Sequence, residues 1–185
     1  MIKNVFLWLA AVLLCTAAFA QQDTAAKQWK FYSVNSFGTM AGDNGSALTV
    51  QSINGLRYKT FSAGIGIGID NYLTRTIPLF LDIRKDLLNR PQTPFVYIDG
   101  GTHFPWTGTQ KTWATIETHP GFYYDLGIGY RFPLEQNSLM LSIGYSMKSY
   151  TEDVTTPTFC SSCPPHEEHF QYNFRRISLK AGVRF

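Results

Sequence analysis

The last ten residues of the chain, Arg176 to Phe185, alternate polar and apolar side chains without a break. Successive side chains of a β-strand point to opposite faces, so this pattern predicts a strand with one apolar and one polar face. The apolar face holds Ile177, Leu179, Ala181, Val183 and Phe185. A membrane-spanning strand needs roughly 9–11 residues, with apolar side chains toward lipid and polar ones toward a lumen. The segment has this length, and we interpret its apolar face as the outer one.

Seven other segments carry strand patterns, so the sequence predicts an all-β chain with eight strands. The predicted strands are 27–37, 48–59, 61–70, 77–84, 95–104, 121–132, 139–150 and 169–185. Turn residues and irregular patterns between them predict turns at 85–94 and 133–137 and loops at 38–45, 105–120 and 151–168. The alternation slips near Asn54 and Gly55, where a β-bulge is the simplest explanation. We predict a single eight-stranded antiparallel up-and-down transmembrane β-barrel.

Glycines alternate with apolar residues in segment 61–70, as Gly64, Gly66 and Gly68. Glycine weakens a strand interior in a soluble sheet, because it has no side chain to pack. On the lumen face of a narrow barrel it leaves room for long charged side chains from the other strands. The same residues look like a nucleotide-binding loop. That interpretation fails because no helix follows whose N-terminus could bind a phosphate.

The final strand, with its apolar residues at every second position and its terminal Phe185, resembles the sorting signal of bacterial outer-membrane β-barrels. The rest of the chain is similar to small eight-stranded barrels of that class. The likeness is strongest to the short, Gly- and Tyr-rich outer membrane protein beta-barrel domain proteins of Bacteroidetes-type bacteria. This resemblance implies that Phe185 is recognised by the barrel-assembly machinery. It brings no catalytic motif with it.

The first twenty residues have the pattern of a cleaved secretory signal peptide. Lys3 supplies the positive charge, 5–14 the apolar region, and 18–20 a cleavage site of small residues around Phe19. An N-terminal membrane anchor is disfavoured because the apolar run is shorter than the roughly 20 residues of a spanning helix. A lipoprotein at Cys15 is disfavoured because Leu14 stands where a small residue is needed. We therefore predict a signal peptide at 1–20 and a barrel domain at 21–185.

Composition agrees with a barrel and excludes some partners. The mean hydropathy of −0.11 is near neutral, as expected when lumen-facing side chains are polar. The net charge of +3 is too small to indicate a nucleic-acid partner. Aromatic residues make up 15% of the chain, which fits girdles at the two membrane interfaces.

Charged residues on the polar faces of the predicted strands form an inward-facing set of both signs. Its acidic members are Asp70, Asp82, Asp99 and Asp125, and its basic members are Arg57, Arg84, Arg131, Lys148, Arg176, Lys180 and Arg184. An eight-stranded barrel is just wide enough for side chains to fill it. We expect these groups to pair into a buried polar core without an open pore, because unpaired buried charges are costly. The alternative is a proton or ion path lined by the same groups.

An enzymatic role is a weaker hypothesis. Acyl transfer needs a nucleophile, a histidine base and an orienting group within hydrogen-bond reach. The histidines are His103, His119, His166 and His169, and all lie in predicted loops or at strand ends. No GxSxG motif occurs in the chain. We therefore predict no catalytic residues and no cofactor.

The segment 160–169 holds four potential metal ligands at every third position. They are Cys160, Cys163, His166 and His169. Thiolates and imidazoles suit tetrahedral zinc, but an exported protein meets oxidising conditions in which two nearby cysteines form a disulfide. We favour a Cys160–Cys163 disulfide and keep the zinc site as the alternative.

Taken together, these patterns predict a monomeric barrel in the outer membrane of a Gram-negative bacterium. Its expected partners are outer-membrane lipid and the assembly machinery, and its outer loops would serve a structural or surface-interaction role. One alternative is a lipid-modifying acyl hydrolase or transferase on the same barrel. Another is a soluble lipocalin-like barrel with its apolar face turned inward around a ligand, because alternation alone does not tell inside from outside.

Overall fold

The computed structural model describes residues 29–43, 45–72, 75–106, 110–111, 114–157, 160 and 166–185. The signal peptide expected at 1–20 lies outside these ranges. The strands are β1 (Trp29–Gly42), β2 (Gly45–Tyr58), β3 (Phe61–Asp70), β4 (Thr76–Asp86), β5 (Thr93–Pro105), β6 (Gln110–Lys111), β7 (Thr115–His119), β8 (Gly121–Pro133), β9 (Ser138–Thr156) and β10 (His166–Arg184). None of the described residues belongs to a helix long and apolar enough to cross a membrane.

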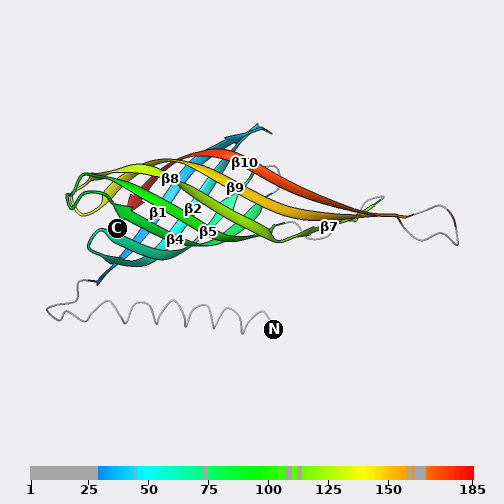
Figure 1. Cartoon of the computed structure of the whole chain (residues 1–185), viewed down its shortest axis with the longest axis horizontal. Helices are drawn as coiled ribbons and strands as arrows, with labels where there is room; N and C mark the ends of the chain where they lie inside the picture. Colours follow the sequence, from blue (N-terminus) through cyan, green and yellow to red (C-terminus); the bar gives the residue numbers. More distant parts are fainter. Residues whose placement is uncertain are drawn as a thin grey trace.

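Eight of these strands close into an antiparallel barrel (Figure 1). The order is β1-β2-β3-β4-β5-β8-β9-β10, and β10 returns to pair with β1. The closing ladder runs from Val34 opposite Arg184 to Gly42 opposite Arg176. Closure satisfies the backbone groups that an open sheet would leave unpaired at its edges. The prediction of an eight-stranded antiparallel barrel is confirmed.

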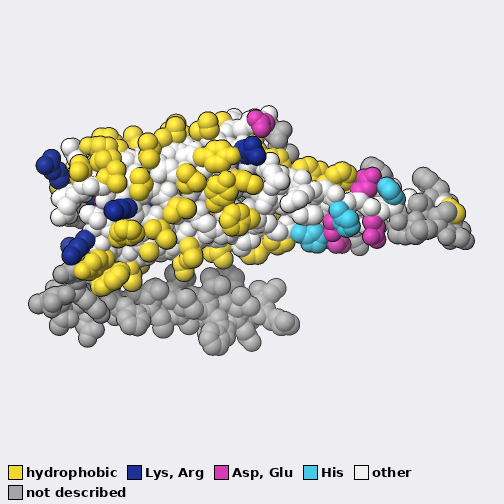
Figure 2. All heavy atoms as spheres, viewed as in Figure 1, with side chains coloured by type: hydrophobic (Ala, Val, Ile, Leu, Met, Phe, Trp, Pro, Cys, Tyr) yellow, Lys and Arg dark blue, Asp and Glu magenta, His cyan; other side chains and the backbone are white. Residues whose placement is uncertain are grey.

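The outer face of the barrel is apolar and the lumen face is largely polar. In β4, Leu81 leaves 63% of its surface exposed, whereas its neighbour Asp82 is completely buried. In β8, Ile128 is 61% exposed and Asp125 completely buried. Hydrophobic side chains are spread over the face of the barrel that Figure 2 shows. The apolar faces predicted for 61–70, 77–84 and 121–132 point outward, which is opposite to the arrangement in a lipocalin-like barrel.

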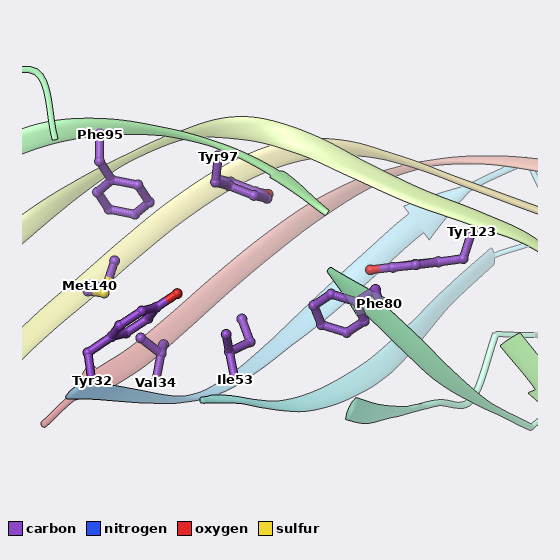
Figure 3. Packing of buried hydrophobic residues seen from close by; sticks show 8 residues of the cluster. All are labelled: Tyr32, Val34, Ile53, Phe80, Phe95, Tyr97, Tyr123 and Met140. Atoms are coloured by element: carbon purple, nitrogen blue, oxygen red, sulfur yellow. The ribbon is translucent and has the colours of Figure 1, made fainter. Parts of the chain in front are cut away.

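The lumen also contains an aromatic and aliphatic cluster (Figure 3). It consists of Tyr32, Val34, Ile53, Phe80, Phe95, Tyr97, Tyr123 and Met140. A Cβ at Gly66 would collide with the Phe80 ring, and a Cβ at Gly129 would collide with the Phe95 ring. Each of these pairs is directly opposed on neighbouring strands. These two glycines therefore make room for aromatic rings of the adjacent strand, and not for charged side chains as we expected.

Other glycines follow the expectation. A Cβ at Gly38 would lie 2.7 Å from the Cγ atom of Lys180, and one at Gly42 would lie 3.1 Å from the Cγ atom of Arg176. The loop predicted at 38–45 is therefore wrong, because Gly38 and Gly42 are strand residues that leave space for these two long side chains. The bulge predicted at Asn54 is also wrong. The β1–β2 ladder is continuous there, and Ile53 faces the lumen while Asn54 faces out.

Two strands, β9 and β10, continue past the barrel and form, together with β7, an extension that we call the blade. It comprises β7 (115–119) and the parts of β9 and β10 at 151–156 and 166–171. β9 lies in the middle, with Asp153 opposite Glu117 on one side and His169 on the other. The blade is the long projection in Figure 1. The loops predicted at 105–120 and 151–168 are therefore shorter than expected.

The opposite end of the barrel, which we call the turn end, carries the tight connections at 59–60, 87–92 and 134–137.

Candidate functional site

The charged side chains of the lumen lie in three layers. In the layer nearest the blade, the Arg176 guanidinium donates to Asp70 and, through Nη2, to the Ser146 hydroxyl at 3.0 Å. The Lys148 ammonium lies 3.6 Å from Asp70 and donates to the Tyr72 carbonyl at 3.1 Å. Asp70, Lys148 and Arg176 are almost completely buried. One carboxylate thus binds two cations in a site closed to water.

The middle layer contains a row of carboxylates. Asp82, Asp99 and Asp125 are directly opposed across β4, β5 and β8. The Lys180 ammonium lies 3.2 Å from Asp125 and 3.7 Å from Asp99. Arg84 donates to Asp82 at 2.7 Å. Like charges repel at this spacing, and the two cations between them offset that repulsion.

Tyrosine hydroxyls complete the middle layer. Tyr32 donates to Asp82 at 3.0 Å, and Tyr97 donates to Asp125 at 2.8 Å. The Lys180 ammonium lies 4.7 Å from the centre of the Tyr97 ring, within the range of a cation–π contact. These tyrosines are not among the lumen residues predicted from the sequence, which were all charged. Their lumen-facing positions in the alternating strands were the available signal.

The layer at the turn end has the opposite balance of charge. One oxygen of Asp86 lies 3.0 Å from Arg57, 3.1 Å from Arg131 and 3.9 Å from Arg184. Three guanidinium groups therefore share one carboxylate. We did not predict Asp86, because the expected strand ended at Arg84. Continuing the same alternation by two residues would have found it.

The structure places all the charges predicted to face inward at the lumen, and each takes part in an ion pair. Arg57 is the most exposed of them, with 27% of its side chain accessible at the turn end. The others have less than a tenth of their surface exposed.

The blade carries a second group of charges, which is exposed. Asp153 accepts a hydrogen bond from His119 at 2.9 Å and another from His169 at 2.6 Å. The bond to Asp153 raises the pKa of His169, and the two imidazoles lower the pKa of Asp153. Histidine and acidic side chains gather along the projection in Figure 2. This arrangement forms a polar surface on the outer face of the blade.

The cysteine segment is only partly described. Cys160 is disulfide-bonded. Its expected partner Cys163 lies outside the described residues, so the pairing stays a prediction. His166 and His169 are three positions apart in β10 and project from opposite faces of the strand. Within the described residues there is no group of three or more His, Cys, Asp or Glu side chains suited to a metal ion.

Each histidine is bonded to a carbonyl or a carboxylate. His103 is buried near the end of β5, and its Nε2 lies 2.8 Å from the Ser149 carbonyl oxygen. His166 contacts Glu168 at 3.2 Å, and His119 and His169 share Asp153. These bonds orient the imidazoles toward structural partners.

Comparison with known proteins identifies the fold. No family model matches the chain, and no curated protein matches it in sequence. The crystal structure of Neisserial surface protein A is similar, with a TM-score of 0.52 and 12% identity over 87% of this chain and 98% of that one. The solid-state NMR structure of the outer membrane protein AlkL in DMPC bilayers has a TM-score of 0.52 and 13% identity, over 89% and 95% of the two chains. The chain therefore has the fold of the eight-stranded outer-membrane β-barrels.

Proposed function

We propose that this protein is a monomeric outer-membrane β-barrel that displays the blade at the cell surface for interaction with an extracellular partner. The observation that carries the proposal is the position of the blade. It continues β9 and β10 beyond a complete apolar belt and ends in polar, exposed strands (Figures 1 and 2). Such strands have no role in crossing lipid.

The membrane location rests on the apolar belt. Large apolar side chains are half exposed or more on strands all around the barrel, including Phe31, Ile65, Leu81, Ile128 and Leu179. Soluble monomers rarely expose an apolar patch of more than a few hundred Å². In a membrane these side chains face lipid, so their exposure to water costs no free energy. The closed sheet pairs the backbone N–H and C=O groups, which lipid cannot hydrogen-bond. The similarity in fold to two outer-membrane proteins supports the same location.

The orientation follows from the connections. Outer-membrane barrels have short turns in the periplasm and longer loops outside the cell. We therefore place the turn end in the periplasm and the blade outside. A Thr155→Cys variant should react with a membrane-impermeant maleimide on intact cells, whereas Asn89→Cys at the turn end should react only after the outer membrane is permeabilised. The reverse pattern would overturn the orientation.

Phe185 belongs to the proposal as an assembly signal, as its resemblance to the family's terminal residue implies. Its N–H donates to the Ser33 carbonyl at 2.9 Å, and its ring is 59% exposed at the turn end. An exposed aromatic ring at a membrane interface suits recognition by another protein. Deleting Phe185 is expected to lower the amount of protein in the outer membrane more than Phe104→Ala does.

The lumen layers support a barrel without an open pore. Buried ion pairs and the aromatic cluster occupy the lumen along its length. We include no ion path and no enzymatic step in the proposal. Planar-bilayer recordings should show no steady conductance, and vesicles containing the protein should show no release of fatty acid from phospholipid. Either activity would favour one of the alternative roles.

The interaction role is tested by shortening the blade. Joining Thr151 to Gln171 through an Asn-Gly turn removes the outer parts of β9 and β10 and leaves the barrel ladder intact. Cells that display the full chain are expected to adhere to a partner surface, and cells with the shortened chain are expected to lose this adhesion at equal surface amounts. Glu168→Gln serves as the matched control because it changes one charge and keeps the blade. Equal adhesion by both variants would remove the blade from the proposed function.

A further inference from the structure

A cavity of about 350 Å³ lies at the turn end, away from the blade. Two tight connections form much of its wall. They are 89–91, between β4 and β5, and 133–138, between β8 and β9. Arg57 of β2 and Arg131 of β8 complete the wall. The volume is at the lower end of the range of small-ligand sites in proteins.

The cavity and the layer beside it carry excess positive charge. Arg57, Arg90 and Arg131 line the cavity, together with one acidic residue, Glu135. The neighbouring Asp86 is already shared among Arg57, Arg131 and Arg184. Four arginines thus face two carboxylates. Low-dielectric walls concentrate such a field, so the cavity attracts anions.

Arg131 is the residue that points to a ligand. It is only 4% exposed, and its Nη2 donates to the Arg90 carbonyl at 3.1 Å, which ties the turn to the barrel wall. Its Nε has no hydrogen-bond partner among the described residues, although the atom is buried. Buried polar atoms are nearly always paired, and Arg131 lines the cavity, so this unpaired donor is the reason to look for a ligand there.

We propose that this cavity binds a phosphate group, either as a free anion or as the headgroup of a phospholipid. The planar guanidinium presents N–H donors in a fork that matches two phosphate oxygens. Arg131 supplies a buried guanidinium that is fixed in the wall, and Arg57 and the exposed Arg90 add positive charge to the lining. The headgroup source rests on the proposed membrane location, because only then does the turn end lie at the periplasmic leaflet. Binding of a free phosphate anion does not depend on the membrane location.

The test uses the full chain, folded in an amine-oxide detergent that contains no phosphate. Inorganic phosphate and dihexanoyl phosphatidylglycerol are titrated separately by calorimetry, and the arginine Nε–H signals are followed by NMR. We expect saturable binding of one phosphate group per barrel, with the Arg131 Nε–H signal moving most. Binding of both probes, with mutual competition, indicates a site open to either source. Binding of one alone identifies the free anion or the headgroup as the ligand.

Variants make the inference falsifiable. Arg131→Gln and Arg90→Gln are each expected to weaken binding about tenfold, as is typical for the loss of one charge-assisted hydrogen bond. Arg90 lies on an exposed turn, so its replacement tests the site even if Arg131→Gln folds poorly. Lys85→Gln removes the same charge from the outer face of this end and is expected to change binding less than twofold.

Two results would overturn the proposal. One is the absence of saturable binding with both probes. The other is an equal loss of binding with Lys85→Gln, which would indicate general charge attraction. Insertion into vesicles is measured separately. A chain that binds phosphate but does not insert would keep this inference and refute the membrane proposal.

Discussion

The barrel body and the blade share strands β9 and β10, but the charged side chains in the lumen of the body are largely buried and those of the blade are exposed to water. In the body, Arg176 and Asp70 form an ion pair with no more than 1% of either side chain exposed. In the blade, His119 and Asp153 form a pair at 2.9 Å with 48% and 33% of their side chains exposed. Water screens the second pair and cannot reach the first. We therefore expect the buried pair to have a strong structural role in the body and the exposed pair to have a weak one in the blade.

The largest effect is expected from removing a buried charge. Asp70→Asn keeps the shape of the side chain but leaves Arg176 and Lys148 without their carboxylate. Breaking a buried pair in this way typically costs about 3–5 kcal/mol. Urea unfolding in lipid vesicles should show a loss of this size.

The matched control in the blade is Asp153→Asn, which leaves two exposed imidazoles in contact with water. We expect no measurable change in the free energy of unfolding. Similar losses for Asp70→Asn and Asp153→Asn would contradict the distinction between body and blade.

A second comparison uses one strand and one face. Ile143 and Thr155 both lie on the outer face of β9, but Ile143 is in the apolar belt and Thr155 is in the blade. Arginine near the bilayer midplane costs roughly 2–4 kcal/mol. Ile143→Arg is therefore expected to destabilise the barrel in vesicles by about this amount, while Thr155→Arg leaves stability within about 0.5 kcal/mol of the wild type.

Ser142→Arg, one position away on the lumen face, is not a suitable control for Ile143→Arg. Ser142 faces Lys180 directly across the β9–β10 ladder. A second cation in the closed lumen would meet both the repulsion of Lys180 and the lack of free space. If Thr155→Arg destabilised the protein as much as Ile143→Arg, the apolar belt could not end before the blade.

The difference between body and blade explains which strands could be predicted from the sequence. In the body, lipid on one side and a polar lumen on the other force each strand to alternate, so all eight barrel strands were found. In the blade both faces meet water. The segments 151–156 and 166–168 are almost entirely polar, and they carry no apolar period that would reveal a strand. β7 was missed for the same reason, and β6 is only two residues long.

Glycine caused one of the remaining errors in the body. The run around Gly38 and Gly42 resembled a loop, but both residues are strand residues paired with Lys180 and Arg176 of β10, which come from the far end of the sequence. Such long-range contacts leave no local signal. The turn-end cavity was not predictable either. It depends on how two turns fold over Arg131, and alternation within a strand says nothing about that.

A smaller effect is expected at the disulfide near the tip of the blade. Replacing Cys160 and Cys163 by Ser is expected to change the free energy of unfolding by no more than about 0.5 kcal/mol, as for most surface substitutions. The predicted ring is very short and lies outside the barrel, so it constrains the folded and unfolded chain alike. Mass spectrometry under non-reducing, alkylating conditions checks the pairing. Two alkylated thiols with one bound zinc would favour the metal site instead.

The smallest effect is a local dependence on pH in the blade. The pKa of His169 is raised by Asp153, so its contribution is fully present below the ordinary value of 6.5 and is lost as the pH rises through the raised pKa. The pKa of Asp153 is lowered, so its contribution is present above 3.8 and is lost as the pH falls through the lowered pKa. The His169–Asp153 contact is therefore strongest between these two ordinary values.

Hydrogen exchange of blade amides is expected to quicken from pH 6 to pH 8, after correction for the intrinsic rate, while barrel amides stay protected. In Asp153→Asn this pH dependence should disappear and the imidazole NMR titration of His169 should move to lower pH. An unchanged titration would show that His169 does not contact Asp153 in solution.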